Sequence, residues 1–257
     1  MSRQRIVSWF SCGAASAVAT KLVIAAYGAT HDVAVARCVV AEEHADNDRF
    51  AADCAAWFGC NITELRSAEY ASCEDVWTRR RFMSGPHGAS CTVEMKKAVR
   101  WDFETAWRPD LQAFGFTTEE TARAERFREQ NPDVRLVTPL IEDGLSKQDC
   151  FAIVDRAGLV LPQSYRDGFA NANCQGCVQA QSPGYWNRTR RLYPDVFARR
   201  AALSRELGVR LVKGTSGERE RLFLDELEPD PDAVDDAPAM DCSLLCWLAE
   251  QKLVVAP

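Results

Sequence analysis

The fold is decided by residues 5–16, which read Arg-Ile-Val-Ser-Trp-Phe-Ser-Cys-Gly-Ala-Ala-Ser. Residues 5–10 form an apolar run typical of a buried strand, and residues 17–26 have the composition of a helix. Small side chains between them let an anion approach the backbone, and the N–H groups of a helix N-terminus attract negative charge. The loop therefore predicts a phosphate or sulfate site or, alternatively, an ordinary tight packing turn. Its residues are Ser11, Cys12, Gly13, Ala14, Ala15 and Ser16.

Strand-like and helix-like segments alternate over the first 160 residues. Further strands are expected at residues 33–40, 62–65, 112–116 and 134–140, and helices at residues 42–59, 72–81, 92–107 and 119–130. This alternation predicts an α/β fold with a doubly wound, mostly parallel five-stranded sheet, whose ligands bind at the carboxyl ends of strands. We expect residues 1–160 to form this nucleotide-binding part. Residues 161–257 would form a helical, Cys-rich extension, and the two would make one compact unit.

Composition narrows the class of protein. The 257 residues have an ordinary apolar content of 47%, and no uncharged apolar stretch reaches the roughly 18 residues of a membrane span. The net charge of −6 is concentrated in residues 225–241, which hold eight of the 37 acids and no base, leaving 29 acids against 31 bases elsewhere. This segment is expected to be a solvated acidic loop. Eleven cysteines in a chain of this size favour a cytoplasmic enzyme with a metal or redox site over a small secreted disulfide scaffold.

The cysteines show a second pattern. Cys174 and Cys177 are separated by two residues, a spacing that fits zinc, an iron–sulfur cluster or a redox pair. Cys91 lies upstream, and Cys242 and Cys246 lie downstream on one face of an expected helix. The alternative is a set of buried thiols without metal. A helix N-terminus would lower the pKa of Cys12, and the alternative is that Cys12 is merely a small residue tolerated in the loop. The remaining cysteines are expected to be inert: Cys38, Cys54, Cys60, Cys73 and Cys150.

The loop at residues 11–16 has neither the Walker spacing nor the dinucleotide fingerprint. It resembles the PP-loop, Ser-Gly-Gly-x-Asp-Ser, with Cys12 in place of the first Gly and Ala15 in place of Asp. The chain as a whole resembles the phosphoadenosine phosphosulfate (PAPS) reductase-like branch of the PP-loop superfamily. The segments that carry this resemblance are residues 11–16, Cys91 followed by Lys96 and Lys97, residues 171–177 followed by 184–187, and residues 241–244.

The resemblance implies a HUP/Rossmann-like fold, an adenine nucleotide (ATP or PAPS-like) and a 4Fe–4S cluster. Family members that carry the cluster hold it with a Cys-Cys pair and a later CxxC, but here Ser90 stands beside Cys91. A cubane cluster takes four thiolates, so Cys91, Cys174 and Cys177 need a fourth ligand. Cys242 is the preferred ligand, with Cys246 then the reactive thiol, or the reverse. Zinc remains an alternative because four thiolates also suit it.

Other residues are placed by the same resemblance. Lys96, Lys97 and Arg100 would hold the sulfate or phosphate of the substrate, and Glu43 and His44 would bind the adenosine or ribose. Arginines at residues 188–205, near aromatic residues, read as a solvated helical face or as a nucleic-acid surface.

Two reactions are compatible with these motifs. The first is thiolation after adenylation by ATP. The resemblance implies a loop Asp that helps to hold Mg²⁺, and Ala15 in its place weakens the case for this reaction. Attack of the Cys242 thiolate on a sulfonucleotide, with an external thiol or another electron or sulfur donor protein as partner, fits Ala15 better. The rival hypothesis is a degenerate PP-loop module that binds nucleotide or nucleic acid, carries a structural zinc and has no catalysis. The oligomeric state stays open.

Overall fold

The centre of the molecule is an all-parallel, five-stranded sheet in the order β3-β2-β1-β6-β7. The computed structural model describes residues 3–85, 88–214, 221–232 and 244–254. The strands are β1 (Arg5–Trp9), β2 (Asp32–Cys38), β3 (Ile62–Leu65), β6 (Leu111–Phe114) and β7 (Leu136–Val137). The chain adds strands outward from β1 to β3 and then crosses to β6, so the strand order reverses between β1 and β6. The predicted α/β class with a doubly wound parallel sheet is confirmed.

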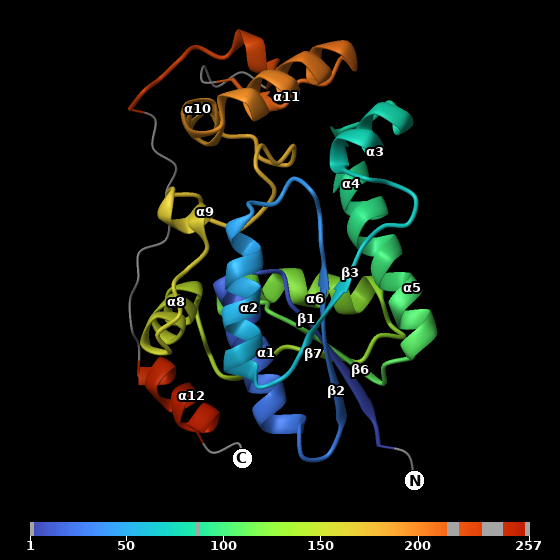
Figure 1. Cartoon of the computed structure of the whole chain (residues 1–257), viewed down its shortest axis with the longest axis vertical. Coiled ribbons are helices and arrows are strands. Elements are labelled where there is room, and N and C mark those ends of the chain that lie inside the picture. Colours follow the sequence, from blue (N-terminus) through green and yellow to red (C-terminus); the bar gives the residue numbers. More distant parts are fainter. Residues whose placement is uncertain (1–2, 86–87, 215–220, 233–243, 255–257) are drawn as a thin grey trace.

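Helices cover both faces of this sheet (Figure 1). One face carries α1 (Ala14–Tyr27), α2 (Asp46–Phe58) and α8 (Lys147–Arg156), and α12 (Leu244–Val254) packs on α1 and α8. The other face carries α5 (Ala98–Trp107) and α6 (Thr121–Gln130). The last described helix therefore returns to the α/β part of the molecule.

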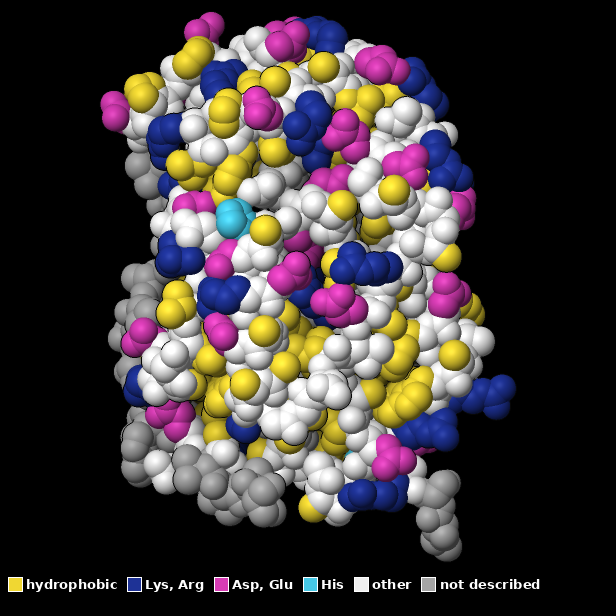
Figure 2. Space-filling view, viewed as in Figure 1, with side chains coloured by type: hydrophobic (Ala, Val, Ile, Leu, Met, Phe, Trp, Pro, Cys, Tyr) yellow, Lys and Arg dark blue, Asp and Glu magenta, His cyan; other side chains and the backbone are white. Residues whose placement is uncertain are grey.

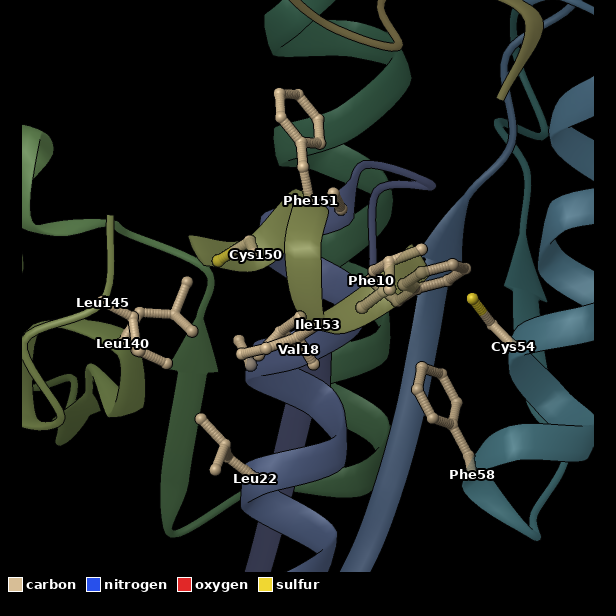
Figure 3. Packing of buried hydrophobic residues seen from close by; sticks show 14 of the residues in the cluster. Phe10, Val18, Leu22, Cys54, Phe58, Leu140, Leu145, Cys150, Phe151 and Ile153 are labelled. Atoms are coloured by element: carbon tan, nitrogen blue, oxygen red, sulfur yellow. The ribbon is translucent and has the colours of Figure 1, made fainter. Parts of the chain in front are cut away.

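The core between α1, α2 and α8 is built from small residues on α1 and larger ones around them. Val18 and Leu22 of α1 pack among Phe10, Phe58 and Ile153, all nearly inaccessible to solvent (Figure 3). Alanines on the buried side of α1 let the helix lie close to the sheet, and the one buried polar pair there is satisfied by a 2.9 Å hydrogen bond between Ser8 Oγ and Thr20 Oγ1.

A second layer lies beyond the carboxyl ends of the strands (Figure 1). Its elements are α3 (Cys73–Arg80), the hairpin β4 (Ser84–Gly85) and β5 (Gly88–Ala89), α4 (Ser90–Thr92), the π-helical turn η1 (Val93–Lys97), α9 (Gln163–Arg166), α10 (Pro183–Leu192), α11 (Pro194–Glu206) and the hairpin β8 (Val212–Lys213) and β9 (Arg221–Leu222). Short helical segments complete the described chain: η2 (Thr118–Glu120), α7 (Pro139–Glu142) and η3 (Leu224–Glu226). Trp77, Met83, Trp186 and Leu211 centre a separate apolar core in this layer.

Two boundaries differ from the sequence prediction. The fifth strand, expected over residues 134–140, is only two residues long and α7 follows it, because Pro139 has no N–H for a sheet ladder. The helix expected over residues 92–107 begins at Ser90 and is interrupted by η1. None of the described helices is both long enough and apolar enough to cross a membrane.

Candidate functional site

The loop at residues 11–16, called the α1 loop below, joins β1 to α1 where the strand order reverses. Ser16 organises it: Oγ accepts hydrogen bonds from the N–H groups of Ser11 (3.1 Å) and Gly13 (3.3 Å) and donates one to the Gly13 oxygen (2.9 Å). Gly115, after β6, approaches so closely that a β-carbon there would lie 2.8 Å from Ser16 Cα. A helix N-terminus with small side chains at a topological switch point is a suitable position for an anion.

The hydroxyl of Tyr165, in α9, lies at this N-terminus. Burial raises the pKa of Tyr165 to about 12, and the backbone N–H groups of Ala14 and Ala172 lie near enough to its oxygen to oppose this rise. A β-carbon added to Gly13 would come to 3.0 Å from the same hydroxyl. A tyrosine oxygen therefore takes up hydrogen-bonding capacity that the helix terminus would offer to a phosphate. Sequence analysis did not single out Tyr165, because no motif marks it.

The prediction that the helix N-terminus lowers the pKa of Cys12 is wrong. The side chain is fully buried in the apolar core beside α1, and burial raises the pKa to about 12. Its Sγ lies 3.6 Å from the Asn47 oxygen, and the residue has a left-handed backbone, with φ 55°. Cys12 thus fills the core, and only its backbone is available to the α1 loop.

Four thiols from three segments come together in the second layer. Cys73 is the first residue of α3, Cys91 lies in α4, and Cys174 and Cys177 lie between α9 and α10. The Cys73 thiol contacts the thiols of Cys174 and Cys91. Cys177 lies near Cys174 and Cys91. We call these four residues the thiol cluster.

Glu42, shortly after β2, ties two of these segments to the sheet. Its backbone oxygen accepts a 2.9 Å hydrogen bond from the N–H of Gln175, between the two cysteines of the CxxC. Its side-chain Oε1 accepts a 3.0 Å hydrogen bond from the N–H of Glu74, in the first turn of α3. The thiol cluster is therefore anchored at the carboxyl end of β2.

The CxxC turn is held from the other side by Tyr185 of α10. The hydroxyl of Tyr185 accepts a 2.7 Å hydrogen bond from the Cys177 N–H and donates one to the Cys174 oxygen at 3.3 Å. Gly176 has φ +63°, and a β-carbon there would lie 2.8 Å from Val196 Cγ1. The turn thus needs a glycine for both its backbone conformation and its packing.

Lys96 is the cation beside the thiol cluster. Its Nζ lies 3.3 Å from Glu43 Oε1. Burial lowers the pKa of Lys96, but Glu43 and the Cys174 thiol more than offset this and raise it overall, so the amine stays charged. Contact with Cys73, the largest effect, and the charge of Lys96 lower the pKa of Cys91 below its usual value in spite of burial. This direction favours a thiolate at Cys91.

Trp77 of α3 supplies a polar group with no ordinary partner. Its side chain is 1% exposed, and its indole Nε1 makes no hydrogen bond of normal geometry. The same N–H lies near enough to the Cys91 sulfur to lower the pKa of that thiol. Buried donors without a protein acceptor are uncommon, and N–H groups aimed at ligand sulfurs are typical of iron–sulfur sites.

The thiol cluster supplies the donor set of a four-thiolate group, although its atoms are not arranged around an ion. Among the described residues, no three His, Cys, Asp or Glu side chains surround one point as ligands of a single metal ion would. Four thiols, the partly buried ammonium group of Lys96 and an unpartnered indole N–H nevertheless fit a [4Fe–4S] cluster chemically. Four thiols alone also suit zinc.

Cys73 was expected to be an inert helix cysteine, and its place in the thiol cluster corrects this expectation. The available signal was its position: Ser72 caps α3, with Oγ accepting a 3.0 Å hydrogen bond from Asp75 N, so Cys73 stands at a helix N-terminus. Such a terminus favours a thiolate, but the neighbouring thiols of Cys174 and Cys91, together with burial, raise the pKa of Cys73. Of the other two cysteines predicted at the site, Cys242 lies outside the described residues, and Cys246 lies in α12 with a side chain that is not described.

The three predicted substrate cations point to different surroundings. Lys96 reaches the thiol cluster, whereas Lys97 is exposed on the next position of η1. Arg100 stacks over Trp9 at 4.8 Å and pairs with Glu104 at 3.3 Å. The structure therefore brings one of the three cations to the cysteines.

Glu43 and His44 lie after β2, near the thiol cluster. The Glu43 carboxylate is 7% exposed and is shared by Lys96 and by the amide of Asn47, at 3.4 Å. The ring of His44 accepts a hydrogen bond from the Asp46 N–H and lies 6.1 Å from the ring of Tyr193. Their role in binding adenosine or ribose stays a prediction.

The arginines of α10 and α11 mostly serve internal contacts. Arg200 is 1% exposed and pairs with Glu74 at 2.8 Å, and Arg190 donates to the Leu227 oxygen at 2.8 Å. Arg205 pairs with Asp225 at 2.7 Å. On the face shown in Figure 2, basic and acidic side chains are interspersed over this part of the molecule. The arginines of α10 and α11 therefore do not form a helical face that is exposed to solvent throughout.

We compared the chain with protein families, with curated proteins and with solved structures. No family model matches the chain, and no curated protein matches it. PAPS reductase from Candida auris, solved with phosphate, is 10% identical over 63% of this chain and 76% of its own, with a TM-score of 0.43. The U34-tRNA thiolase NcsA from Methanococcus maripaludis, solved with its [4Fe–4S] cluster, is 14% identical over 96% of this chain and 81% of its own, with a TM-score of 0.45.

The structure combines an α/β fold with a small-residue loop at a helix N-terminus and a cluster of four cysteines. Each of the two solved proteins is one to which the chain is similar at low identity.

Proposed function

We propose that the chain is an enzyme of adenine-nucleotide-dependent sulfur chemistry, a reductase or a sulfurtransferase, with a [4Fe–4S] cluster on Cys73, Cys91, Cys174 and Cys177. The observation that carries the proposal is the contact of the Cys73 thiol with Cys91 and Cys174. It supplies the fourth thiolate that a cubane cluster takes, without requiring Cys242. The cluster would supply electron transfer or polarisation of sulfur, and Lys96 would offset the negative charge of its thiolates.

With Cys73 as a ligand, Cys242 is free to be the reactive thiol, with Cys246 as its alternative. Its thiolate attacks the sulfur of a sulfonucleotide, the bond from sulfur to the bridging phosphate oxygen breaks, and the nucleotide leaves with the electron pair. The cysteine S-sulfonate is then resolved by an external thiol, which forms a disulfide with Cys242 and releases sulfite. The backbone N–H groups of the α1 loop would hold the anionic group of the nucleotide.

Ala15 favours this reaction over cleavage of ATP, because the loop has no carboxylate to help hold Mg²⁺. An ATP-dependent thiolation remains the second reaction to assay. Both reactions need a thiol or another donor of electrons or sulfur as a partner.

The test is the metal content of the full chain purified without oxygen. We expect about four iron and four sulfide per chain, the content of one cubane cluster. Cys73→Ser should lose most of this iron, whereas Cys54→Ser, a buried cysteine outside the thiol cluster, should keep it. Cys242→Ser should keep the iron and lose turnover.

Two results would contradict the proposal. Full iron in Cys73→Ser together with loss of iron in Cys242→Ser would return the fourth ligand to Cys242. Stoichiometric zinc without sulfide, with nucleotide binding but no turnover, would establish the rival binding module.

A further inference from the structure

A cavity of about 340 Å³ opens beside the CxxC turn, within the range of small-molecule sites. Its walls come from the chain between α9 and α10, from those two helices and from Tyr193, which joins α10 to α11. The lining residues are Ser164, Phe169, Ala170, Asn171, Asn173, Cys174, Gln175, Cys177, Gln179, Ala180, Gln181, Ser182, Tyr185 and Tyr193. Neither Cys73 nor Cys91 belongs to them, so the cavity lies on the side of Cys174 and Cys177 away from the centre of the thiol cluster.

The chemistry of the lining is unusually uniform. It contains no charged side chain, five side-chain amides (Asn171, Asn173, Gln175, Gln179 and Gln181) and three aromatic rings. Phe169 and Tyr193 are stacked at 6.0 Å with a 13° tilt, and Tyr185 meets Phe169 edge-on at 5.3 Å. Amides offer paired donors and acceptors, and aromatic faces offer stacking. Such walls suit an uncharged, planar ring with several hydrogen-bonding groups.

The cavity is distinct from the α1 loop. Ser164 lines the cavity, whereas its neighbour Tyr165 directs its hydroxyl to Ala14 and does not line it. No cation lines the cavity, and the nearby ammonium group of Lys147 already donates hydrogen bonds to Ala170 O and Asn171 Oδ1. The cavity is therefore less suitable for a phosphate or sulfate than the α1 loop. The segment from Ser164 to Asn171 therefore has an anion site on one side and a neutral, amide-rich site on the other.

We propose that this cavity binds a nucleobase other than the one carried by the nucleotide at the α1 loop, and presents it to the cysteine centre. The reaction of the bound base rests on the proposed function, whereas the binding of a nucleobase in the cavity does not. The substrate class is then a nucleoside or a nucleotide unit of a nucleic acid, whose base enters next to Cys174 and Cys177.

The test titrates uridine, cytidine, adenosine and guanosine into the full chain, purified without oxygen, by calorimetry. Nucleosides have no phosphate and so do not compete for the α1 loop. We expect at least one of them to bind with one site per chain, and to bind equally in saturating ATP. Tyr193→Leu, which removes a ring from the wall, should weaken binding roughly 5- to 100-fold, the range of one base–aromatic stack. Tyr193→Phe keeps the ring and should bind nearly as the parent does.

Gln181→Leu should also weaken nucleoside binding, whereas Gln130→Leu, an exposed amide at the end of α6, should not. Iron content and ATP affinity are measured for each variant, so that loss of the fold or of the proposed function is seen separately. No nucleoside binding in protein that holds iron and binds ATP would overturn the inference. Displacement of the nucleoside by ATP would overturn it too, by making the cavity the nucleotide's own base site.

Discussion

The hydroxyl of Tyr165 and the backbone of Gly13 lie so close that a β-carbon on the glycine would be 3.0 Å from the tyrosine oxygen. The backbone N–H of Ala14 also lies near enough to this oxygen to lower the pKa of the tyrosine. The helix N-terminus that suits an anion is therefore partly satisfied by a neutral group. An incoming phosphate has to displace this hydroxyl or share the site with it.

Tyr165→Phe tests this relationship. The backbone N–H groups of Ala14 and Ala172 lose an acceptor, which should lower the free energy of unfolding by about 1–3 kcal/mol. Phosphate and ATP should bind about 2- to 10-fold more tightly, because one hydrogen bond no longer has to be broken. Urea denaturation and calorimetry measure the two effects. Tyr27→Phe, at the opposite end of α1, is the matched control, and weaker phosphate binding by Tyr165→Phe would show that the hydroxyl assists the anion instead.

Asp46 holds α9, and with it Tyr165, against α2. Hydrogen bonds from Arg49 hold the pKa of Asp46 well below its usual range against the opposing effect of burial, with help from the Gln163 N–H. A depressed folded-state pKa means that this stabilisation is complete above the unfolded-state value of about 3.9 and is lost as the pH falls below it. Between neutral pH and this acidic range, the free energy of unfolding should therefore fall more steeply in the parent than in Asp46→Asn. Asp102→Asn, exposed on α5, should follow the parent, and identical slopes for the parent and Asp46→Asn would contradict the assignment.

Gly176→Ala should destabilise the CxxC turn. The left-handed backbone and the 2.8 Å approach to Val196 both oppose a β-carbon, and together they should cost about 1–3 kcal/mol and lower bound metal. Gly208→Ala shares the backbone conformation, with φ +69°, but no atom lies within 4 Å of its added carbon. Its metal content should stay at the parent level. Equal metal loss in both variants would mean that backbone strain anywhere, and not the packing of this turn, is responsible.

Trp77→Phe should change the electronic properties of the centre without emptying it. Removing an N–H group near the Cys91 sulfur should lower the reduction potential by at most about 20–65 mV, taking as the upper limit the 0.5–1.5 kcal/mol of an ordinary hydrogen bond and 59 mV for each tenfold change. Potentiometric titration followed by optical or electron paramagnetic resonance spectroscopy measures this. Trp57→Phe, on α2 away from the thiol cluster, is the control. An unchanged potential at full iron occupancy would show that the Trp77 N–H does not interact with the sulfurs of the centre.

The sequence predicts the local parts of this molecule better than the meeting of distant ones. The strand at Ile62–Leu65 and the loop after β1 follow from apolar runs and small residues, which act over a few positions. Cys73 has no ligand-type spacing to another cysteine, so its contact with Cys91 depends on the path of the hairpin between α3 and α4. Tyr165 likewise reaches the α1 loop only because the Asp46 ion pairs dock α9 on α2. In β7 a local signal is overridden: Val134, Leu136 and Val137 favour a longer strand, but Pro139 ends the ladder.

The order in which the thiol cluster is synthesised follows from its three segments. Cys73 and Cys91 precede β6 and β7 in the chain, and Cys174 and Cys177 follow them. A growing chain on the ribosome therefore displays two of the four thiols while the sheet is still missing two strands. Any group that needs all four can be inserted only after α9 has emerged, so loading of the centre belongs to the finished fold and not to the nascent chain.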